Sequence, residues 1–233
     1  MTGTAFLRAR RGALLAGGLT LALIGAACSP ATREVGSGAS TAVSDSTGGT
    51  VPGTVRDPFP DVSAMEAIEF SQDPAGVPMS FTPPEGELAA VYFGYLSCPD
   101  ICPLTMADLA AALNKLPPED AARVTPAFVT VDPERDDGAR LVSYMTHFFP
   151  EHPFRAYQAI DTGTLNRLAY EFHVQYSIPQ HEDGEFYAVA HSGFVYLVDD
   201  RGLVVRELPF GTPSADTATA IAAELDAQDQ REG

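Results

Sequence analysis

The chain is poor in cysteine and in positive charge. Among its 233 residues are 3 cysteines and 14 lysines and arginines, against 31 aspartates and glutamates, so the formal net charge is −17. Proteins that bind nucleic acid or anionic lipid by electrostatics need clustered basic residues. We therefore expect no nucleic-acid partner and no electrostatic attraction to anionic lipid.

Large apolar residues are almost absent from residues 29–55, which are rich in Ser, Thr, Gly and Ala. Such a stretch cannot bury enough surface to order itself, so we predict a flexible linker over residues 28–55. From about residue 56 to residue 233 the chain has the length of a single domain, and no internal repeat is visible.

Residues 1–27 are typical of an export signal, in which a basic start precedes an apolar run and small residues. Because Cys28 directly follows those small residues, this site resembles a bacterial lipoprotein cleavage site. We therefore predict a signal peptide over residues 1–27, lipidation of Cys28, and a protein exported and anchored to the outer face of the cell membrane. Plain secretion, with Cys28 as a bystander, is the alternative.

Buried apolar runs alternate with helical periodicity through the first part of the domain. A hairpin is predicted over residues 65–81. The three strands that follow are expected at residues 88–96, 123–131 and 154–160, and their helices at residues 106–116, 141–149 and 162–173. The acidic residues 132–137 can cap the second of these helices.

In the rest of the domain, residues 174–189 are predicted to form an inserted loop or hairpin. Strands at residues 191–198 and 203–208 flank the turn at 199–202, and a closing helix follows from residue 212 to about 226. This order is typical of an α/β, thioredoxin-like fold. We expect a central mixed sheet flanked by helices, with a hairpin or loop inserted before the strand that His191 opens.

Cys98 and Cys102 stand where the first long strand ends and its helix begins. A helix N-terminus stabilises thiolates, and two thiolates about 6 Å apart along one helical turn would make a soft site that selects Cu(I). The alternative is a structural disulfide, but its very short loop would stabilise the fold little.

His191 is a candidate third ligand, since imidazole beside two sulfurs accommodates Cu(II) as well as Cu(I). A purely structural histidine is the alternative, and the sequence does not decide between them. His147, His152 and His173 are expected at surfaces, and His181 in a solvated loop. Asp132 and Asp100 are each expected to cap a helix or to hydrogen-bond the cysteine loop.

Three motifs, taken together, resemble the Sco/SenC family of membrane-tethered copper-delivery proteins. They are Gly-Tyr-Leu-Ser-Cys-Pro-Asp-Ile-Cys-Pro at residues 94–103, Val-Asp-Pro-Glu-Arg-Asp at 131–136, and His191 ahead of Tyr-Leu-Val-Asp at 196–199. The resemblance implies a thioredoxin-like fold and copper bound as Cu(I) or Cu(II) by Cys98, Cys102 and His191. It implies delivery to the binuclear copper site of cytochrome c oxidase subunit II or to another extracytoplasmic copper protein.

Two residues depart from the family's usual pattern. Ser97 stands where a histidine commonly precedes the first cysteine, and Ala190 where an aspartate commonly precedes the ligand histidine. Without that acid the site lacks one group that could orient the imidazole or balance its charge. The metal affinity or the preferred copper oxidation state is therefore expected to differ from that of typical members.

An enzyme is the alternative function. Cys98 and Cys102 could serve as the redox pair of a thiol–disulfide oxidoreductase that keeps the cysteines of a copper acceptor reduced. Against this as the sole role, such enzymes usually have two residues between their cysteines, whereas this chain has three. They also resemble one another in a cis-proline just before the strand that His191 would open, and residues 187–190 contain no proline. A peroxidase-like relative is less attractive because its mechanism does not need His191.

Overall fold

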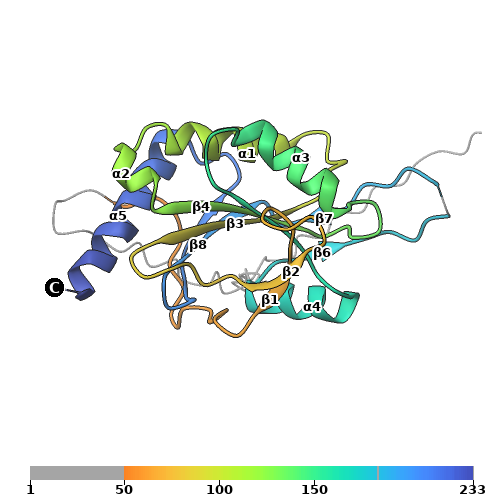
Figure 1. Ribbon diagram of the computed structural model, residues 1–233, viewed down its shortest axis with the longest axis horizontal. Helices are drawn as coiled ribbons and strands as arrows, with labels where there is room; N and C mark the ends of the chain where they lie inside the picture. The colour runs from red at the N-terminus through yellow and green to blue at the C-terminus, as the bar shows by residue number, and fades with distance from the viewer. Residues whose placement is uncertain (1–49, 183, 233) are drawn as a thin grey trace, which may run out of the picture. The chain divides into compact units, whose positions relative to one another are not determined.

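The computed structural model describes residues 50–182 and 184–232 (Figure 1). The expected signal peptide, Cys28 and most of the expected linker lie outside these residues. Within the described part of the chain, no helix combines the length and the apolar character needed to cross a bilayer.

A seven-stranded mixed sheet forms the centre of the domain, in the order β2-β1-β5-β4-β3-β8-β9. The strands β3, β4 and β5 run parallel, and the remaining pairs are antiparallel. Their bounds are β1 Glu66–Glu69, β2 Val77–Ser80, β3 Leu88–Gly94, β4 Val124–Thr130, β5 Arg155–Gln158, β8 Phe194–Val198 and β9 Val204–Pro209. The predicted mixed sheet and its hairpins are confirmed.

Helices cover both faces of this sheet. Figure 1 shows α1 (Ile101–Leu113) and α3 (Gly138–Phe148) on one face and α4 (Thr162–Glu171) on the other. The long helix α5 (Ser214–Glu232) packs against α1, and the short helix α2 (Pro118–Ala121), which was not predicted, follows α1. The expected thioredoxin-like fold is confirmed.

The inner strand β3 is buried along its whole length, as its continuous apolar sequence predicts. It lies between the parallel strand β4 and the antiparallel strand β8. Its carboxyl end leads directly into the segment that carries Cys98 and then into α1. A fully buried strand with a neighbour on each side therefore leads into the cysteine motif.

The side chain of Asp137 caps α3 by accepting a hydrogen bond from the backbone N–H of Arg140 at 2.9 Å. The prediction that the acidic run caps this helix is confirmed. In contrast, α1 begins at Ile101, five residues before the first apolar position that suggested it, so Cys102 lies in its first turn. The helix α5 also continues past the predicted end, to Glu232.

The strand that was predicted to run from His191 to Val198 is divided in the structure. Ala190–His191 forms β7, which pairs with β6 (Tyr176–Ser177) in a separate two-stranded ribbon, whereas β8 begins at Phe194. The interruption follows from Ser192, whose N–H bonds to the carbonyl of Gln175 at 2.8 Å instead of joining the main sheet. The expected insertion before the strand is this ribbon.

The described chain begins with a segment that lies along β9. Thr54 and Glu207 exchange two backbone hydrogen bonds, of 2.8 and 2.9 Å, and Asp61 bridges Leu203 further along. Arg206, paired with Glu224, also donates to the carbonyl of Pro52 at 3.1 Å. Part of the stretch whose composition predicts a linker is thus in contact with the folded domain.

Candidate metal centre

Three side chains with metal-binding atoms converge at the carboxyl end of β3. Cys98 follows this strand, Cys102 lies in the first turn of α1, and His191 comes from β7. Their ligand atoms all lie within 4.8 Å of one another, and Nε2 of His191 is 3.3 Å from Sγ of Cys102. The fold therefore brings residues 89 positions apart in the sequence into one cluster.

The two cysteines differ in their surroundings, and both are free thiols. Cys98 is half-buried and precedes the helix, with its N–H donating to the carbonyl of Tyr95 at 3.2 Å. Cys102 is fully buried, and the hydroxyl of Tyr92 donates to its sulfur at 3.7 Å. The two cysteines therefore do not share a helical turn.

Burial raises the pKa of the Cys102 thiol to about 12. The expectation that the helix N-terminus would favour both thiolates is thus wrong for Cys102 in the metal-free protein. Removing this sulfur from water disfavours its charged form more strongly than the helix end favours it. A cation bound beside the sulfur would supply the missing stabilisation.

His191 is arranged to offer a lone pair to the cluster. Its Nδ1 lies 3.2 Å from the carbonyl oxygen of Ser192, which can only accept. In the tautomer that carries its proton on Nδ1, the lone pair of Nε2 faces Cys102. Burial lowers the pKa of His191, so the neutral, ligating form is favoured. The rings of Tyr92 and Tyr95 pack edge-on against the imidazole at 6.0 and 5.8 Å.

A buried carboxylate that the sequence analysis missed supports the cysteine loop. Asp136 accepts hydrogen bonds at Oδ2 from the N–H of Leu96 at 3.0 Å and from the hydroxyl of Thr130 at 2.7 Å. Its other oxygen, Oδ1, is buried without a partner among the described residues, and burial raises the pKa of this carboxyl. The sequence feature that could have revealed this role is the position of Asp136, four residues after Asp132 and just past a buried strand.

Asp132 does not perform either of the roles expected for it. Its buried carboxylate accepts a hydrogen bond from the hydroxyl of Tyr187 at 2.9 Å and pairs with Arg135. The helix cap is Asp137, and the cysteine loop is held by Asp136. Asp100 occupies the N-cap position of α1 but makes no side-chain capping bond.

The remaining histidines lie outside the cluster. The ring of His181 stacks on Tyr187 at 3.8 Å, and Nε2 of His152 lies 2.7 Å from the carbonyl of Val124. His147 packs edge-on against Phe148. In the described ranges, Cys98, Cys102 and His191 form the one group of three or more histidine, cysteine or acidic residues arranged to share an ion.

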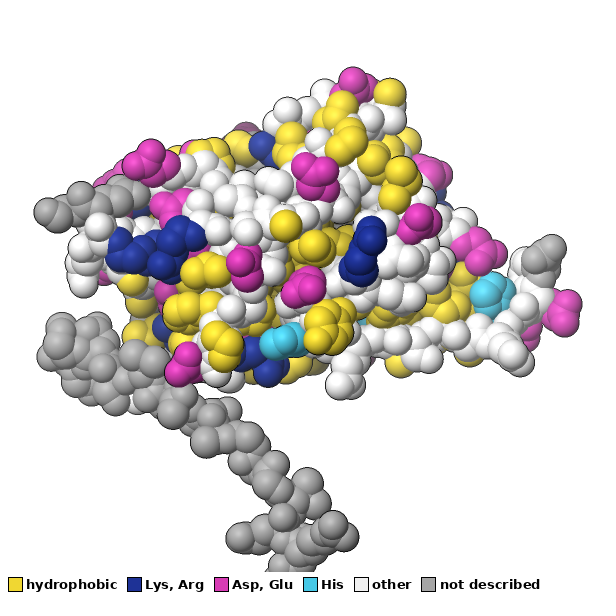
Figure 2. Space-filling model, turned by 90° about the horizontal axis from the view of Figure 1, so that it is seen from below, with side chains coloured by type: hydrophobic (Ala, Val, Ile, Leu, Met, Phe, Trp, Pro, Cys, Tyr) yellow, Lys and Arg dark blue, Asp and Glu magenta, His cyan; other side chains and the backbone are white. Residues whose placement is uncertain are grey.

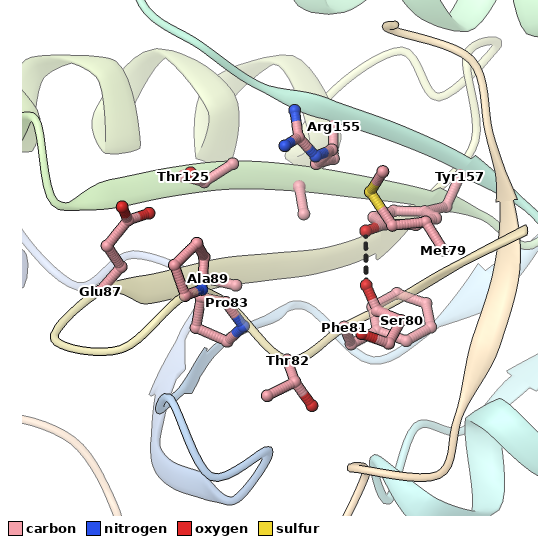
Figure 3. Close-up of a pocket in the computed structure, with 12 residues that line it drawn as sticks. Met79, Ser80, Phe81, Thr82, Pro83, Glu87, Ala89, Thr125, Arg155 and Tyr157 are labelled. Carbon is pink, nitrogen blue, oxygen red and sulfur yellow. Dashed lines mark hydrogen bonds between the residues drawn. The ribbon is translucent and has the colours of Figure 1, made fainter. Parts of the chain in front are cut away.

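A cavity of about 410 Å³ lies elsewhere on the sheet, between β2 and its following loop and the strands β3, β4 and β5. Figure 3 shows Arg155, Glu87 and Ala89 among the side chains that line it. None of the three clustered residues lines it.

Acidic side chains are scattered over the face in Figure 2, in agreement with the overall negative charge.

Comparison with protein families shows that residues 65–226 match the SCO1/SenC family model. Among curated proteins, the chain is 36% identical to the mitochondrial SCO2 homologue of Mus musculus over 51% of this chain and 46% of that protein. It is 35% identical to the mitochondrial SCO1 protein of Saccharomyces cerevisiae over 53% of this chain and 41% of that protein. The matched region thus spans about half the length of these curated relatives or less.

Solved structures show the same relationship. Arabidopsis thaliana ScoI with copper bound gives a TM-score of 0.60 and 26% identity, covering 70% of this chain and 96% of that one. Apo Sco1 from Thermus thermophilus gives a TM-score of 0.58 and 28% identity, covering 75% of this chain and 95% of that one. Yeast Sco1 with copper bound matches with a TM-score of 0.61 and 26% identity, over 72% of this chain and 91% of that one.

Proposed function

This chain belongs to the SCO1/SenC family, and from that premise we propose that it is a copper chaperone. In this proposal it binds one copper ion through Cys98, Cys102 and His191 and delivers the ion to another copper protein outside the cytoplasm. The observation that supports it most directly is the convergence of two sulfurs and one imidazole nitrogen within 4.8 Å.

The donor set fits copper chemically. Soft thiolates select Cu(I), and the added imidazole nitrogen also suits Cu(II). Two ligands bonded to one ion at about 2.0–2.3 Å, the distances of comparable zinc sites, lie at most about 4.6 Å apart. The observed spacing of up to 4.8 Å needs only small side-chain movements to reach that geometry.

Delivery would proceed by ligand exchange. Cys98 is the more accessible sulfur, so an incoming thiolate of the acceptor would replace it first and buried Cys102 afterwards. Binding also has to displace the Cys102 proton, since burial raises the pKa of that thiol to about 12, and loading is therefore expected to release protons. The proposed acceptor is the binuclear copper site of cytochrome c oxidase subunit II.

We propose that the domain acts at the outer face of the cell membrane. The support is the sequence pattern alone, with a signal over residues 1–27, Cys28 as the lipidated residue, a linker to residue 55 and the copper-binding domain over residues 56–233. A lipid on Cys28 would keep the domain near membrane-bound acceptors.

Copper stoichiometry of the reduced full-length protein tests the ligand assignment. The parent protein is expected to retain one copper ion per chain, Cys98→Ser and Cys102→Ser to retain none, and His191→Ala to lose mainly the Cu(II) form. His147→Ala is the matched control, because this histidine is exposed and outside the cluster. Equal retention by the parent and Cys98→Ser would refute the assignment.

A second candidate function is reduction of the acceptor's cysteines. The contrast between half-buried Cys98 and buried Cys102 favours it, because one thiolate must reach a partner while the other resolves the product. The Cys98 thiolate would attack the acceptor disulfide, and Cys102 would then attack the mixed disulfide. The products would be the reduced acceptor and a Cys98–Cys102 disulfide. An insulin-reduction assay that supplies a small dithiol to re-reduce the Cys98–Cys102 disulfide tests this function. Turnover above the rate of the dithiol alone would support it, and a rate equal to that background would leave copper delivery alone.

A further inference from the structure

The segment that carries His191 is anchored outside the main sheet. β7 has only two residues and pairs with β6, so the position of the imidazole depends on side-chain anchors at its two ends. After His191, Ser192 binds Gln175 through its N–H and through its hydroxyl, which accepts from the Gln175 N–H, both at 2.8 Å. Before His191, the anchor is Tyr187.

Tyr187 is locked by two residues of the loop after β4. Its hydroxyl donates to Oδ1 of buried Asp132 at 2.9 Å, and its carbonyl accepts from Nη1 of Arg135 at 2.9 Å. Arg135 also donates from Nε to Oδ2 of the same Asp132, so hydrogen bonds link Tyr187, Asp132 and Arg135 in a closed ring. Hydrogen bonds between charged partners are roughly twice as strong as neutral ones, so this ring is a firm attachment.

Arg135 also holds the Tyr187 ring by stacking. Its guanidinium carbon lies 3.5 Å from the ring centroid, and the His181 ring lies 3.8 Å from the same centroid at 26°. Two groups so close to one centroid would collide on a single face, so they cover opposite faces of Tyr187. A guanidinium over an aromatic ring is attracted to it electrostatically, so this contact helps to hold Tyr187.

The same guanidinium reaches the cysteine side of the cluster. It lies 5.7 Å from the ring of Tyr95, and that ring lies edge-on to His191 at 5.8 Å. Tyr95 in turn accepts the backbone N–H of Cys98. Arg135 therefore contacts one tyrosine on each side of the cluster, Tyr187 ahead of His191 and Tyr95 ahead of Cys98.

The two cysteines have supports that do not involve the Arg135 side chain. The loop after β3 is fixed by the hydrogen bond that the N–H of Leu96 donates to the carboxylate of Asp136. Cys102 is held by its place in α1 and by the hydroxyl of Tyr92. Loss of the Arg135 side chain would therefore free the histidine segment while leaving the sulfur pair in place.

We infer that Arg135 is a positioning residue that holds His191 against the two sulfurs and thereby sets how well the site accepts Cu(II). Cu(I) is satisfied by the two thiolates, whereas Cu(II) benefits from the imidazole. This inference rests on the proposed copper-binding function. Asp132 holds the Arg135 side chain in place, and Arg135 acts on the His191 segment through Tyr187.

Separate measurements of Cu(I) and Cu(II) binding to the full-length protein test the inference. Arg135→Ala is expected to weaken Cu(II) binding about 10–100-fold, the usual cost of losing a group that orients a ligand, and to weaken the thiolate-to-Cu(II) absorption band. Cu(I) affinity, measured by competition with a chelator, is expected to stay at the parent value. Arg167→Ala is the matched control, because Arg167 is exposed on α4 and donates to Thr164.

Two further variants keep the test decisive if Arg135→Ala does not fold. Arg135→Lys keeps the charge but loses the planar fork, and Tyr187→Phe keeps the ring but loses the bond to Asp132. Both are expected to weaken Cu(II) binding relative to the parent protein, without a change in Cu(I) affinity.

The outcomes separate this inference from the proposed function. If His191→Ala weakens Cu(II) binding but the Arg135 and Tyr187 variants do not, the positioning role is overturned and the copper site stands. If these variants weaken Cu(I) and Cu(II) equally, Arg135 supports the fold in general, and the inference is also overturned. If the cysteine variants bind copper as the parent does, the proposed function itself fails.

Discussion

Gly94 lies so close to Cys102 that a side chain on it would press on the sulfur. A Cβ atom at position 94 would be 2.9 Å from Sγ of Cys102 and 2.8 and 3.0 Å from the rings of Tyr92 and Phe128. The rings are buried and cannot give way easily. The glycine at the end of β3 is therefore a spacing requirement of the metal cluster.

Gly94→Ala is accordingly expected to displace Cys102 and lower copper retention. Overpacking of this kind costs about 1–3 kcal/mol of stability, so the midpoint of urea unfolding should fall as well. Gly163→Ala is the control, because its added Cβ would meet nothing closer than 3.4 Å. Full copper retention by Gly94→Ala would show that the cluster has more freedom than the structure indicates.

Ala190→Asp restores the acid that commonly precedes the ligand histidine in the family. A carboxylate beside the imidazole stabilises its charged form, so the pKa of His191, which burial lowers, is expected to rise in the metal-free protein. Cu(II) binding should tighten, since negative charge favours the higher oxidation state. NMR titration of the histidine ring checks the first effect, and exposed Ala188→Asp shows whether a more distant charge does the same.

Asp137→Ala is expected to lower stability without affecting copper binding. It removes the N-cap of α3, in which the side chain accepts the Arg140 N–H, and such losses cost about 1 kcal/mol. Asp137→Asn keeps an accepting oxygen and should be close to the parent in urea unfolding. A loss of copper from Asp137→Ala while the protein remains folded would contradict this separation.

Asp136→Asn is expected to change how stability depends on pH. Because burial raises the pKa of Asp136 in the folded state, the folded protein binds the proton more tightly, and stability falls as pH rises from the ordinary aspartate range through the raised value. The amide does not titrate. The unfolding free energy of the variant relative to the parent should therefore increase with pH across this window, and a constant difference would contradict the assignment.

Much of the fold is predictable because its strands are buried on both faces and its helices have clear apolar periods. The strand over residues 88–96 and its parallel partner appear close to their predicted bounds. The start of α1 was placed too late because Cys102 and Thr105, which extend the buried face of this helix by one turn, are not large apolar residues. A search for large apolar residues at helical spacing therefore finds only the later turns of this helix.

The site was predictable in its residues but not in its supports. Cys98, Cys102 and His191 stood out by residue type and motif, whereas the separate ribbon that carries His191 could not be read from an alternating apolar run. The hydrogen bonds that join Asp132 and Arg135 to Tyr187 link residues 52 to 55 positions apart, and no local sequence pattern predicts such a contact. The burial that raises the pKa of Cys102 is likewise a property of packing.

The segment that lies along β9 has a consequence for where the chain can be shortened. Through the pairing of Thr54 with Glu207 and of Pro60 with Val204, the protein supplies the outermost partner of its own sheet. Cleavage downstream of residue 62 would remove this segment and leave the backbone groups of β9 unpaired on that side. An unpaired strand edge can pair with a second molecule, which promotes aggregation. A shortened chain that stays monomeric must therefore begin upstream of Thr54.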